Sequence, residues 1–341
     1  MKSKDAIRKR IRMTNFYLET VNIEGFKSFS EKTDMGFQPG IGVIIGNNGV
    51  GKSNILDAIV WALGENDLER IRCYNNRELF FAGSKDYPPA TKIRVELILK
   101  EGKEKNAPEI RLTREKTKDG ADHYWISDTS YPRDIYRQKL DDFNLRHSLK
   151  TIIRQEQIND ILQLNPWQRF EAIRFLLNVE SKEKAVRRLR NSIDHLFRRY
   201  MSYLIPLGEV KLDLLSHNGK NGLEIEVTLS GNRVRRAHQL SGGEKSITSL
   251  ALKLAVFDQL ESPFFLLDEV EPSLDYTNHK SMQAFLKDVA AQKQLIMITH
   301  LRSSIALANT VHGVRTRWDG SSFMKYYFVM NERLLRLYKC C

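Results

Sequence analysis

The sequence predicts an α/β fold with two lobes, a largely parallel core sheet, an antiparallel β subdomain and flanking helices. Short apolar runs at 264–267 and 295–298 alternate with segments of helical periodicity, as buried parallel strands do when helices connect them. A β-branched run at 41–45 leads directly into a glycine-rich loop. Between 92 and 127, alternating segments separated by charged turns predict the antiparallel group.

The first third of the chain is expected to hold many of the strands. Residues 16–24 alternate between apolar and polar side chains, which predicts a strand. After the loop that begins at Gly46, apolar residues recur every three or four positions, so a helix is expected to end near Gly64. Three further strands are expected from their alternation, at 92–99, 109–114 and 122–127.

The rest of the chain is expected to be richer in helix. Residues 135–200 should be mainly helical, and an apolar stripe through 183–200 predicts a helix that packs against other elements. Two strands joined by Asn-Gly turn residues are expected, at 208–215 and 222–229, with Asn218-Gly219 and Asn221-Gly222 as the turn. The remaining elements alternate between helices and strands, at 243–259, 264–267, 277–290, 295–298 and from about 301.

Composition describes a globular chain. Of its 341 residues, 41% are hydrophobic and 28% are charged, as is typical of folded domains. No run approaches the roughly eighteen apolar residues of a membrane span and no secretory signal is visible, so an intracellular protein without a membrane partner is expected. The cysteines, Cys73, Cys340 and Cys341, form neither a disulfide framework nor a metal-binding pattern.

The charge balance favours polyanionic partners such as DNA. Lys and Arg number 54 against 42 Asp and Glu, which gives a formal net charge of +12. Basic residues gather at 1–12 and at 182–199, and both segments are candidate phosphate-contacting surfaces. A disordered arm and a solvated helix face would explain the same two clusters equally well.

One segment matches the pattern of a phosphate-binding loop, with a glycine, four residues, and then Gly-Lys-Ser. It comprises Gly46, Asn47, Asn48, Gly49, Val50, Gly51, Lys52 and Ser53. In such a loop the backbone N–H groups surround the β-phosphate, the lysine reaches β- and γ-oxygens, and the serine binds magnesium. An incidental Gly-Lys-Ser turn is the competing interpretation, and the flanking strand and helix argue against it.

Two carboxylates follow the apolar strand at 264–267. In a parallel sheet, Asp268 and Glu269 would then lie at the same edge as the phosphate loop. We expect Asp268 to hold the magnesium and Glu269 to orient and deprotonate the attacking water.

A serine-glycine turn opens the helix expected at 243. Its residues are Leu240, Ser241, Gly242, Gly243 and Glu244. A hydroxyl and glycine N–H groups at a helix N-terminus suit a γ-phosphate. A plain serine N-cap with Glu244 in the first turn is the alternative interpretation.

This ordered set of motifs resembles the ATP-binding cassette superfamily and, in detail, the head of an SMC (structural maintenance of chromosomes) ATPase. The resemblance covers about residues 14–316. Beyond the three motifs above, it rests on Gly25-Phe26-Lys27-Ser28-Phe29, Asn54, Phe81-Ala82-Gly83-Ser84, the continuation of the serine-glycine turn to Leu254, Val270, and Ile298-Thr299-His300.

The resemblance implies a composite site in which two heads enclose ATP. The turn at Ser241 (the signature) would contact nucleotide that is held by Lys52 of a partner head. Gln155 would complete the magnesium shell, and His300 would lie near the γ-phosphate. Further implied roles are ATP contacts for Lys27 and Asn54, a dimer-interface position for Asp275 in the D-loop, and a DNA-coupled role for Arg72.

The implied domain order is a basic arm at 1–12, an N-lobe at 13–180, a C-lobe at 181–330 and a tail at 331–341. The N-lobe would carry the phosphate loop and the loop at Gln155 (the Q-loop). The C-lobe would carry the signature, the magnesium carboxylate, the D-loop and the histidine.

The implied function is Mg-dependent ATP hydrolysis at a head–head interface, coupled to chromosome organisation and segregation. The implied partners are a second head (a homodimer), DNA bound without sequence specificity, and a kleisin-type subunit, in a cytoplasmic, nucleoid-associated setting. A coil-less RecF-like repair ATPase and a transporter nucleotide-binding subunit are the alternatives.

Some residues depart from the family pattern. Glu156 replaces the usual glycine after Gln155, and Asn47 replaces the usual proline of the phosphate loop. Ser241 follows Gln155 by only 86 positions, which leaves no room for the coiled-coil arm and hinge of an SMC protein. Two explanations stay open: a head from which the arm has been removed, or a natural coil-less relative.

Overall fold

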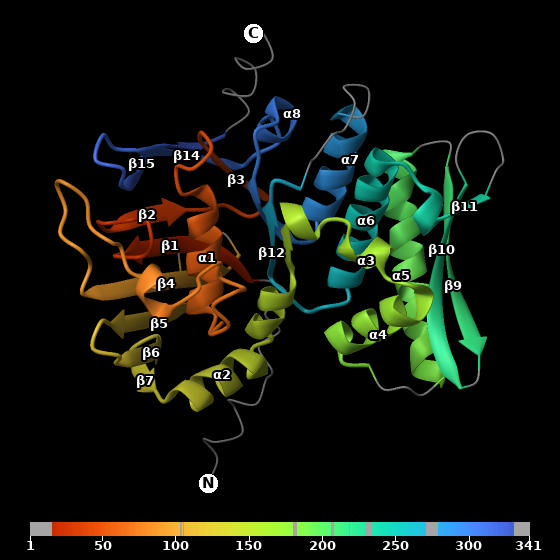
Figure 1. Cartoon of the computed structure of the whole chain (residues 1–341), viewed down its shortest axis with the longest axis horizontal. Helices are drawn as coiled ribbons and strands as arrows, with labels where there is room; N and C mark the ends of the chain where they lie inside the picture. Colours follow the sequence, from red (N-terminus) through yellow and green to blue (C-terminus); the bar gives the residue numbers. More distant parts are fainter. Residues whose placement is uncertain are drawn as a thin grey trace. The chain divides into compact units, whose positions relative to one another are not determined.

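The computed structural model describes residues 16–102, 104, 106–179, 183–205, 208–217, 219–228, 234–270 and 279–330 (Figure 1). The chain forms two compact units. Unit 1 comprises Met1–Ile152, Glu261–Asp268 and Lys293–Cys341, and unit 2 comprises Ile153–Leu260 and Glu269–Gln292. The expected lobes are consecutive segments, whereas these units interleave, because the chain returns to unit 1 twice after leaving it. The predicted arm at 1–12 and tail at 331–341 lie outside the described residues.

The first sheet of unit 1 is antiparallel and has the strand order β2-β1-β4-β5-β6-β7. Its strands are β1 (Phe16–Glu24), β2 (Thr33–Gly36), β4 (Lys92–Glu101), β5 (Glu109–Thr117), β6 (Asp122–Ile126) and β7 (Thr129–Tyr131). Along β4, buried and less buried residues alternate, so one face of the sheet lies on the core. The predicted antiparallel subdomain is therefore confirmed, and it includes the predicted strand at 16–24.

The second sheet of unit 1 supplies the predicted parallel core. Its strands run in the order β15-β14-β3-β13-β12, and β3 is parallel to both β13 and β14. They are β3 (Ile41–Ile45), β12 (Phe264–Asp268), β13 (Gln294–Ile298), β14 (Thr310–Thr316) and β15 (Ser322–Val329). All residues of β12 and β13 are buried. The short strand β8 (Ile152–Arg154) carries the chain from unit 1 into unit 2.

Helix α1 (Lys52–Ala62) connects the two sheets of unit 1, since it contacts β1, β4 and β5 of one and β12 of the other. Nine of its eleven residues are buried. A helix that is apolar on nearly all sides belongs in a core, and α1 ends two residues before Gly64, as predicted. The other helices of unit 1 are α2 (Arg133–Asp142), the four-residue α8 (Arg302–Ile305), and the 3₁₀ turns η3 (Asn76–Leu79) and η4 (Leu145–Lys150).

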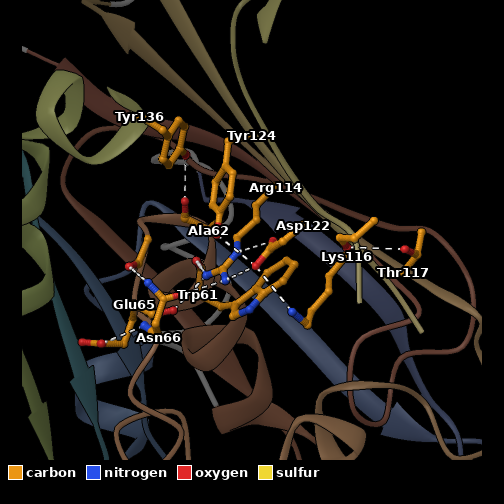
Figure 2. A network of polar contacts seen from close by, with 12 residues as sticks. Trp61, Ala62, Glu65, Asn66, Arg114, Lys116, Thr117, Asp122, Tyr124 and Tyr136 are labelled. Atoms are coloured by element: carbon orange, nitrogen blue, oxygen red, sulfur yellow. Dashed lines mark hydrogen bonds and ion pairs between the residues drawn. The ribbon is translucent and has the colours of Figure 1, made fainter. Parts of the chain in front are cut away.

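A buried arginine anchors the end of α1 to the antiparallel sheet, as Figure 2 shows. The Arg114 guanidinium donates to the carbonyl oxygens of Trp61 and Glu65, at 2.9 and 2.8 Å. It also donates to both oxygens of Asp122, at 3.1 and 2.9 Å. Burial alone would raise the pKa of Asp122, but the hydrogen bond and charge of Arg114 lower it below its ordinary value. The helix that begins at the phosphate loop is thus held at its far end.

His312, on β14, is fully buried between the rings of Phe37 and Tyr327, with centroids 4.5 and 4.9 Å away. Burial lowers the pKa of its imidazole to about 4. The unfolded chain binds a proton near the ordinary pKa of about 6.5, so stability is lost as the pH falls from about 6.5 toward 4. When the pH is lowered from 7.5 to 5, the free energy of unfolding should fall by about 2 kcal/mol because of His312 alone.

Urea unfolding at the two pH values checks this expectation. His312→Phe keeps an aromatic ring of similar size and removes the titration, so its unfolding free energy should fall by about 2 kcal/mol less than that of the wild type. Equal losses in both proteins would show that His312 does not set this pH dependence.

Unit 2 is built from helices and one antiparallel sheet of order β11-β10-β9. Its helices are α3 (Asp160–Gln163), α4 (Pro166–Leu177), α5 (Glu183–Leu204), α6 (Gly242–Phe257), α7 (His279–Ala290), η5 (Gln155–Gln157) and η6 (Ala237–Gln239), and its strands are β9 (Glu209–His217), β10 (Lys220–Thr228) and β11 (Val234–Arg236). Helix α5 buries Val186, Ile193 and Phe197, so the predicted apolar stripe is confirmed. Among the described residues, no helix is long and apolar enough to cross a lipid bilayer.

One predicted turn is wrong. Lys220 pairs with His217 in the β9–β10 hairpin, so Asn221 and Gly222 lie inside β10. A Cβ atom on Gly222 would lie 2.8 Å from the Trp167 ring, so the glycine serves close packing in a strand. The expected helix from 301 is also only four residues long, because the chain enters β14 at Thr310.

Candidate nucleotide site

The phosphate loop lies between β3 and α1, as predicted, and surrounds the Lys52 ammonium. Lys52 is 5% exposed, and its Nζ donates to the carbonyl oxygens of Gly46 and Asn47, both at 2.9 Å. Gly51 has a φ of 96°, which favours glycine, and precedes the first residue of α1. A Cβ on Gly46 would lie 2.4 Å from the Val314 carbonyl oxygen. The loop therefore requires these glycines, and it leads into a helix N-terminus of the kind that binds phosphate groups.

Ser53 and Asp268 meet at the base of this loop. The Ser53 hydroxyl donates to Asp268 Oδ1 at 3.2 Å, although the two residues are 215 positions apart. Asp268 is the last residue of β12 and is 7% exposed. A hydroxyl and a carboxylate beside a phosphate loop are oxygen ligands of the kind that Mg²⁺ uses together with nucleotide phosphates, so the residues present fit the expected ion.

The register of the parallel strands places His300 at the same sheet edge. Asp268 lies opposite Ile298, and Ile298 lies opposite Ile44 on β3. His300 follows Ile298 by two positions, and Gly46 follows Ile44 by two. Because carboxyl ends of parallel strands share an edge, the histidine and the loop emerge side by side.

Glu269 directly follows Asp268 and adopts a left-handed backbone conformation, with a φ of 49°. Such a conformation costs a non-glycine residue about 1–3 kcal/mol and often marks a functional position. The strand ends at Asp268, so Glu269 lies outside β12.

Unit 2 carries the predicted Q-loop and signature residues. Gln155 is exposed in η5, and Ser241 is the N-cap of α6. The Ser241 oxygen accepts from the Glu244 N–H at 3.4 Å, while Glu244 accepts from the Ser241 N–H at 2.7 Å. Ser241 thus caps α6 together with Glu244, and this role leaves its hydroxyl hydrogen available for donation. The signature role of the turn stays a prediction.

The signature helix is joined to the chain that follows Gln155. Ser249 donates to the Ile158 carbonyl oxygen, and Lys253 donates to that of Gln157 and pairs with Asp160. Burial lowers the pKa of Lys253, against the opposing hydrogen bond and charge of Asp160. The Q-loop and signature helix thus form one connected element within unit 2.

Lys27 and Arg72 converge on a residue that the sequence analysis missed, Asp57 of α1. Lys27 Nζ lies 2.7 Å from Asp57 Oδ2, and Arg72 donates to the same oxygen at 2.7 and 3.1 Å. The signal was an acidic residue within an otherwise apolar stretch of helix. Asn54 donates to the Ser28 hydroxyl at 2.8 Å. ATP contacts for Lys27 and Asn54 stay predictions.

Asp275, the predicted D-loop residue, lies outside the described residues.

The basic segment at 182–199 is partly neutralised. Several of its arginines pair with acidic side chains, which lowers the net charge of this segment's surface. These pairs are Arg190 with Asp213, Arg198 with Asp194 and Arg199 with Asp288.

Comparisons with known proteins agree with this geometry. The model of the RecF/RecN/SMC N terminal domain matches residues 17–322. The chromosome partition protein Smc of Mycobacterium leprae is 33% identical over 181 residues, which are 51% of this chain and 15% of that protein. This chain therefore corresponds to a small part of such a relative.

Solved structures show the same fold. A crystal structure of an SmcHead bound to the C-winged helix domain of ScpA superposes with a TM-score of 0.83 and 30% identity, over 92% of this chain and 98% of that one. The SMC head domain from Thermotoga maritima gives 0.67 and 28%, over 92% and 99%. With the family match over residues 17–322, these findings show that the chain belongs to the RecF/RecN/SMC N-terminal domain family and has the fold of an SMC head of the ATP-binding cassette type.

Proposed function

We propose that this chain binds Mg-ATP in the phosphate loop and hydrolyses it at an interface between two copies of the head. The observation that carries the proposal is the contact between Ser53 and Asp268 beside the loop that encloses Lys52. These side chains come from distant parts of the sequence. Together they supply two oxygen ligands for magnesium, from Ser53 and Asp268, and one ammonium for the phosphates, from Lys52.

The chain's own residues supply distinct roles in this reaction. Lys52 and the loop N–H groups hold the phosphates, and Ser53, Asp268 and Gln155 are the proposed magnesium ligands. The bound ion would neutralise the charge that develops on the phosphate oxygens. Glu269 orients the attacking water and accepts its proton, while His300 lies near the γ-phosphate.

The second copy is proposed because the signature lies at an exposed helix N-terminus, where Ser241 is the N-cap of α6. Ser241 is exposed, and a Cβ on Gly242 would meet nothing within 4 Å. Such a helix N-terminus suits a γ-phosphate that another head presents. The interface role implied for Asp275 belongs to the same proposal, and this residue lies outside the described residues.

Chromosome organisation and segregation is the proposed process, in a cytoplasmic, nucleoid-associated setting. The net charge of +12 supports contact with DNA through its phosphates, without sequence specificity. One similar structure is a head bound to the C-winged helix domain of ScpA, which supports a kleisin-type subunit as a further partner.

Ser241→Arg tests the two-copy arrangement. The bulky cation should block ATP-dependent dimerisation, while ATP affinity of the single head stays within about twofold, because Lys52 holds nucleotide in its own subunit. Analytical ultracentrifugation with and without Mg-ATP measures the dimer. Ser216→Arg, at an exposed position of β9, is the matched control. If Ser241→Arg dimerised as the wild type does, the proposed interface would be wrong.

A further inference from the structure

Asp57 is a buried carboxylate in the middle of α1, five residues after Lys52. It is 0% exposed, and a single oxygen, Oδ2, accepts hydrogen bonds from both Lys27 and Arg72. A buried charge is stable only when it is paired and hydrogen-bonded. Two cationic side chains, those of Lys27 and Arg72, therefore pair with one buried carboxylate on α1, the helix that begins at the phosphate loop.

Both cationic residues have strained backbones. Lys27 has a φ of 49° and Arg72 a φ of 54°, in the left-handed region that non-glycine residues seldom adopt. The Lys27 N–H donates to the Leu79 carbonyl oxygen at 2.8 Å, and its Nζ donates to that of Ile71 at 2.5 Å. Strain of this kind persists only where surrounding contacts over-determine it, and it gathers at functional positions.

A series of polar contacts continues from Arg72 to the phosphate loop. Arg72 Nη2 lies 3.4 Å from Asn54 Oδ1, and Asn54 Nδ2 donates to Ser28 Oγ at 2.8 Å. Ser322 Oγ lies 2.7 Å from Ser28 Oγ and 2.7 Å from the Val50 carbonyl oxygen. The position of Arg72 is thus linked to the main chain of the loop.

The phosphate loop also packs directly against the Ser28 and Ser322 hydroxyls, at Gly51. A Cβ atom on Gly51 would lie 2.4 Å from Ser322 Oγ and 2.6 Å from Ser28 Oγ. A small displacement of Ser28 would therefore shift Gly51, the N-cap of α1.

We propose that Asp57 is a positioning residue: it fixes Arg72 and Lys27 and, through Asn54 and Ser28, holds the phosphate loop in the conformation that binds ATP. The inference rests on the proposed nucleotide binding, and it adds to that site a residue outside the loop. It requires no contact between Asp57 and ATP.

Steady-state kinetics of Asp57→Asn test the proposal. Hydrogen bonds to charged groups are worth about 1.5–3 kcal/mol, so a loop that has lost this support should bind ATP about tenfold more weakly. The expected result is a KM for ATP about tenfold higher with kcat within about twofold, because the loop contacts the substrate and the transition state alike. A purely structural role would lower the folded fraction, and thus kcat, with KM unchanged.

Arg72→Gln completes a double-mutant cycle. It removes only the Arg72–Asp57 ion pair, and Lys27 still neutralises Asp57, so the variant should fold and should raise KM severalfold. The double variant should have a KM no higher than the worse single variant. Asp34→Asn, at an exposed acid that pairs with Lys32 at 3.5 Å, is the matched control and should keep the wild-type KM.

The outcomes separate this inference from the proposed function. A wild-type protein that binds no ATP would overturn both. Wild-type ATP binding with additive effects in the cycle, or with an unchanged KM in Arg72→Gln, would overturn the positioning role of Asp57 alone. The Arg72→Gln result decides the question even if Asp57→Asn fails to fold.

Discussion

Glu269→Gln is expected to lower the turnover of ATP by about a thousandfold while ATP binding is retained. The amide keeps the size of the side chain but accepts no proton from the attacking water, and general bases contribute about 10²–10⁴ to rates. Glu269 lies outside β12, which ends at Asp268, so we expect the substitution to leave the Asp268 carboxylate, a proposed magnesium ligand, in place.

Two measurements decide this expectation. Single-turnover hydrolysis gives the chemical rate, and mass measurement with and without Mg-ATP should show a trapped dimer, because the nucleotide at the interface is no longer consumed. Glu209→Gln, at an exposed position of β9, is the matched control and should hydrolyse ATP normally. A wild-type rate in Glu269→Gln would exclude this residue as the base.

Lys52→Ala should abolish detectable ATP binding, with an affinity loss of at least about a hundredfold. Hydrogen bonds from a charged donor are worth about 1.5–3 kcal/mol each, and this ammonium would reach two phosphate oxygens. The Lys52 side chain also donates hydrogen bonds to the Gly46 and Asn47 carbonyl oxygens. Its removal therefore takes away two contacts that hold the loop conformation, as well as the positive charge.

Equilibrium binding of a fluorescent ATP analogue measures the loss. Thermal unfolding of the same samples shows whether the variant is folded. Lys92→Ala removes a half-exposed lysine that pairs with Glu115 at 3.4 Å, and it should bind nucleotide as the wild type does. An affinity for Lys52→Ala within about twofold of the wild type would contradict the nucleotide site itself.

Much of the fold follows from local pattern. The strands at 16–24 and 41–45 have the predicted bounds, since alternation and β-branched runs are properties of neighbouring residues. The phosphate loop was located for the same reason, because glycines and the adjoining lysine and serine lie within eight positions.

Other elements could not be found in this way. Strands β14 and β15 were missed, because buried polar residues interrupt the expected apolar pattern: Thr310 and His312 in β14, and Ser322 in β15. Asn221 and Gly222 have the composition of a turn, but the packing of Trp167 on Gly222 places them in a strand. At Gly222 a distant contact outweighs the local preference.

The amino-acid sequence by itself determined which residues form the loop, the acid pair and the signature, since each motif depends on short spacings that local backbone geometry requires. Only the tertiary structure decided that Ser53 meets Asp268, 215 positions away, and that one oxygen of Asp57 holds both Lys27 and Arg72. The physical reason is that a buried charge must be satisfied by whatever partner the fold brings within hydrogen-bonding distance, and sequence spacing does not encode that distance.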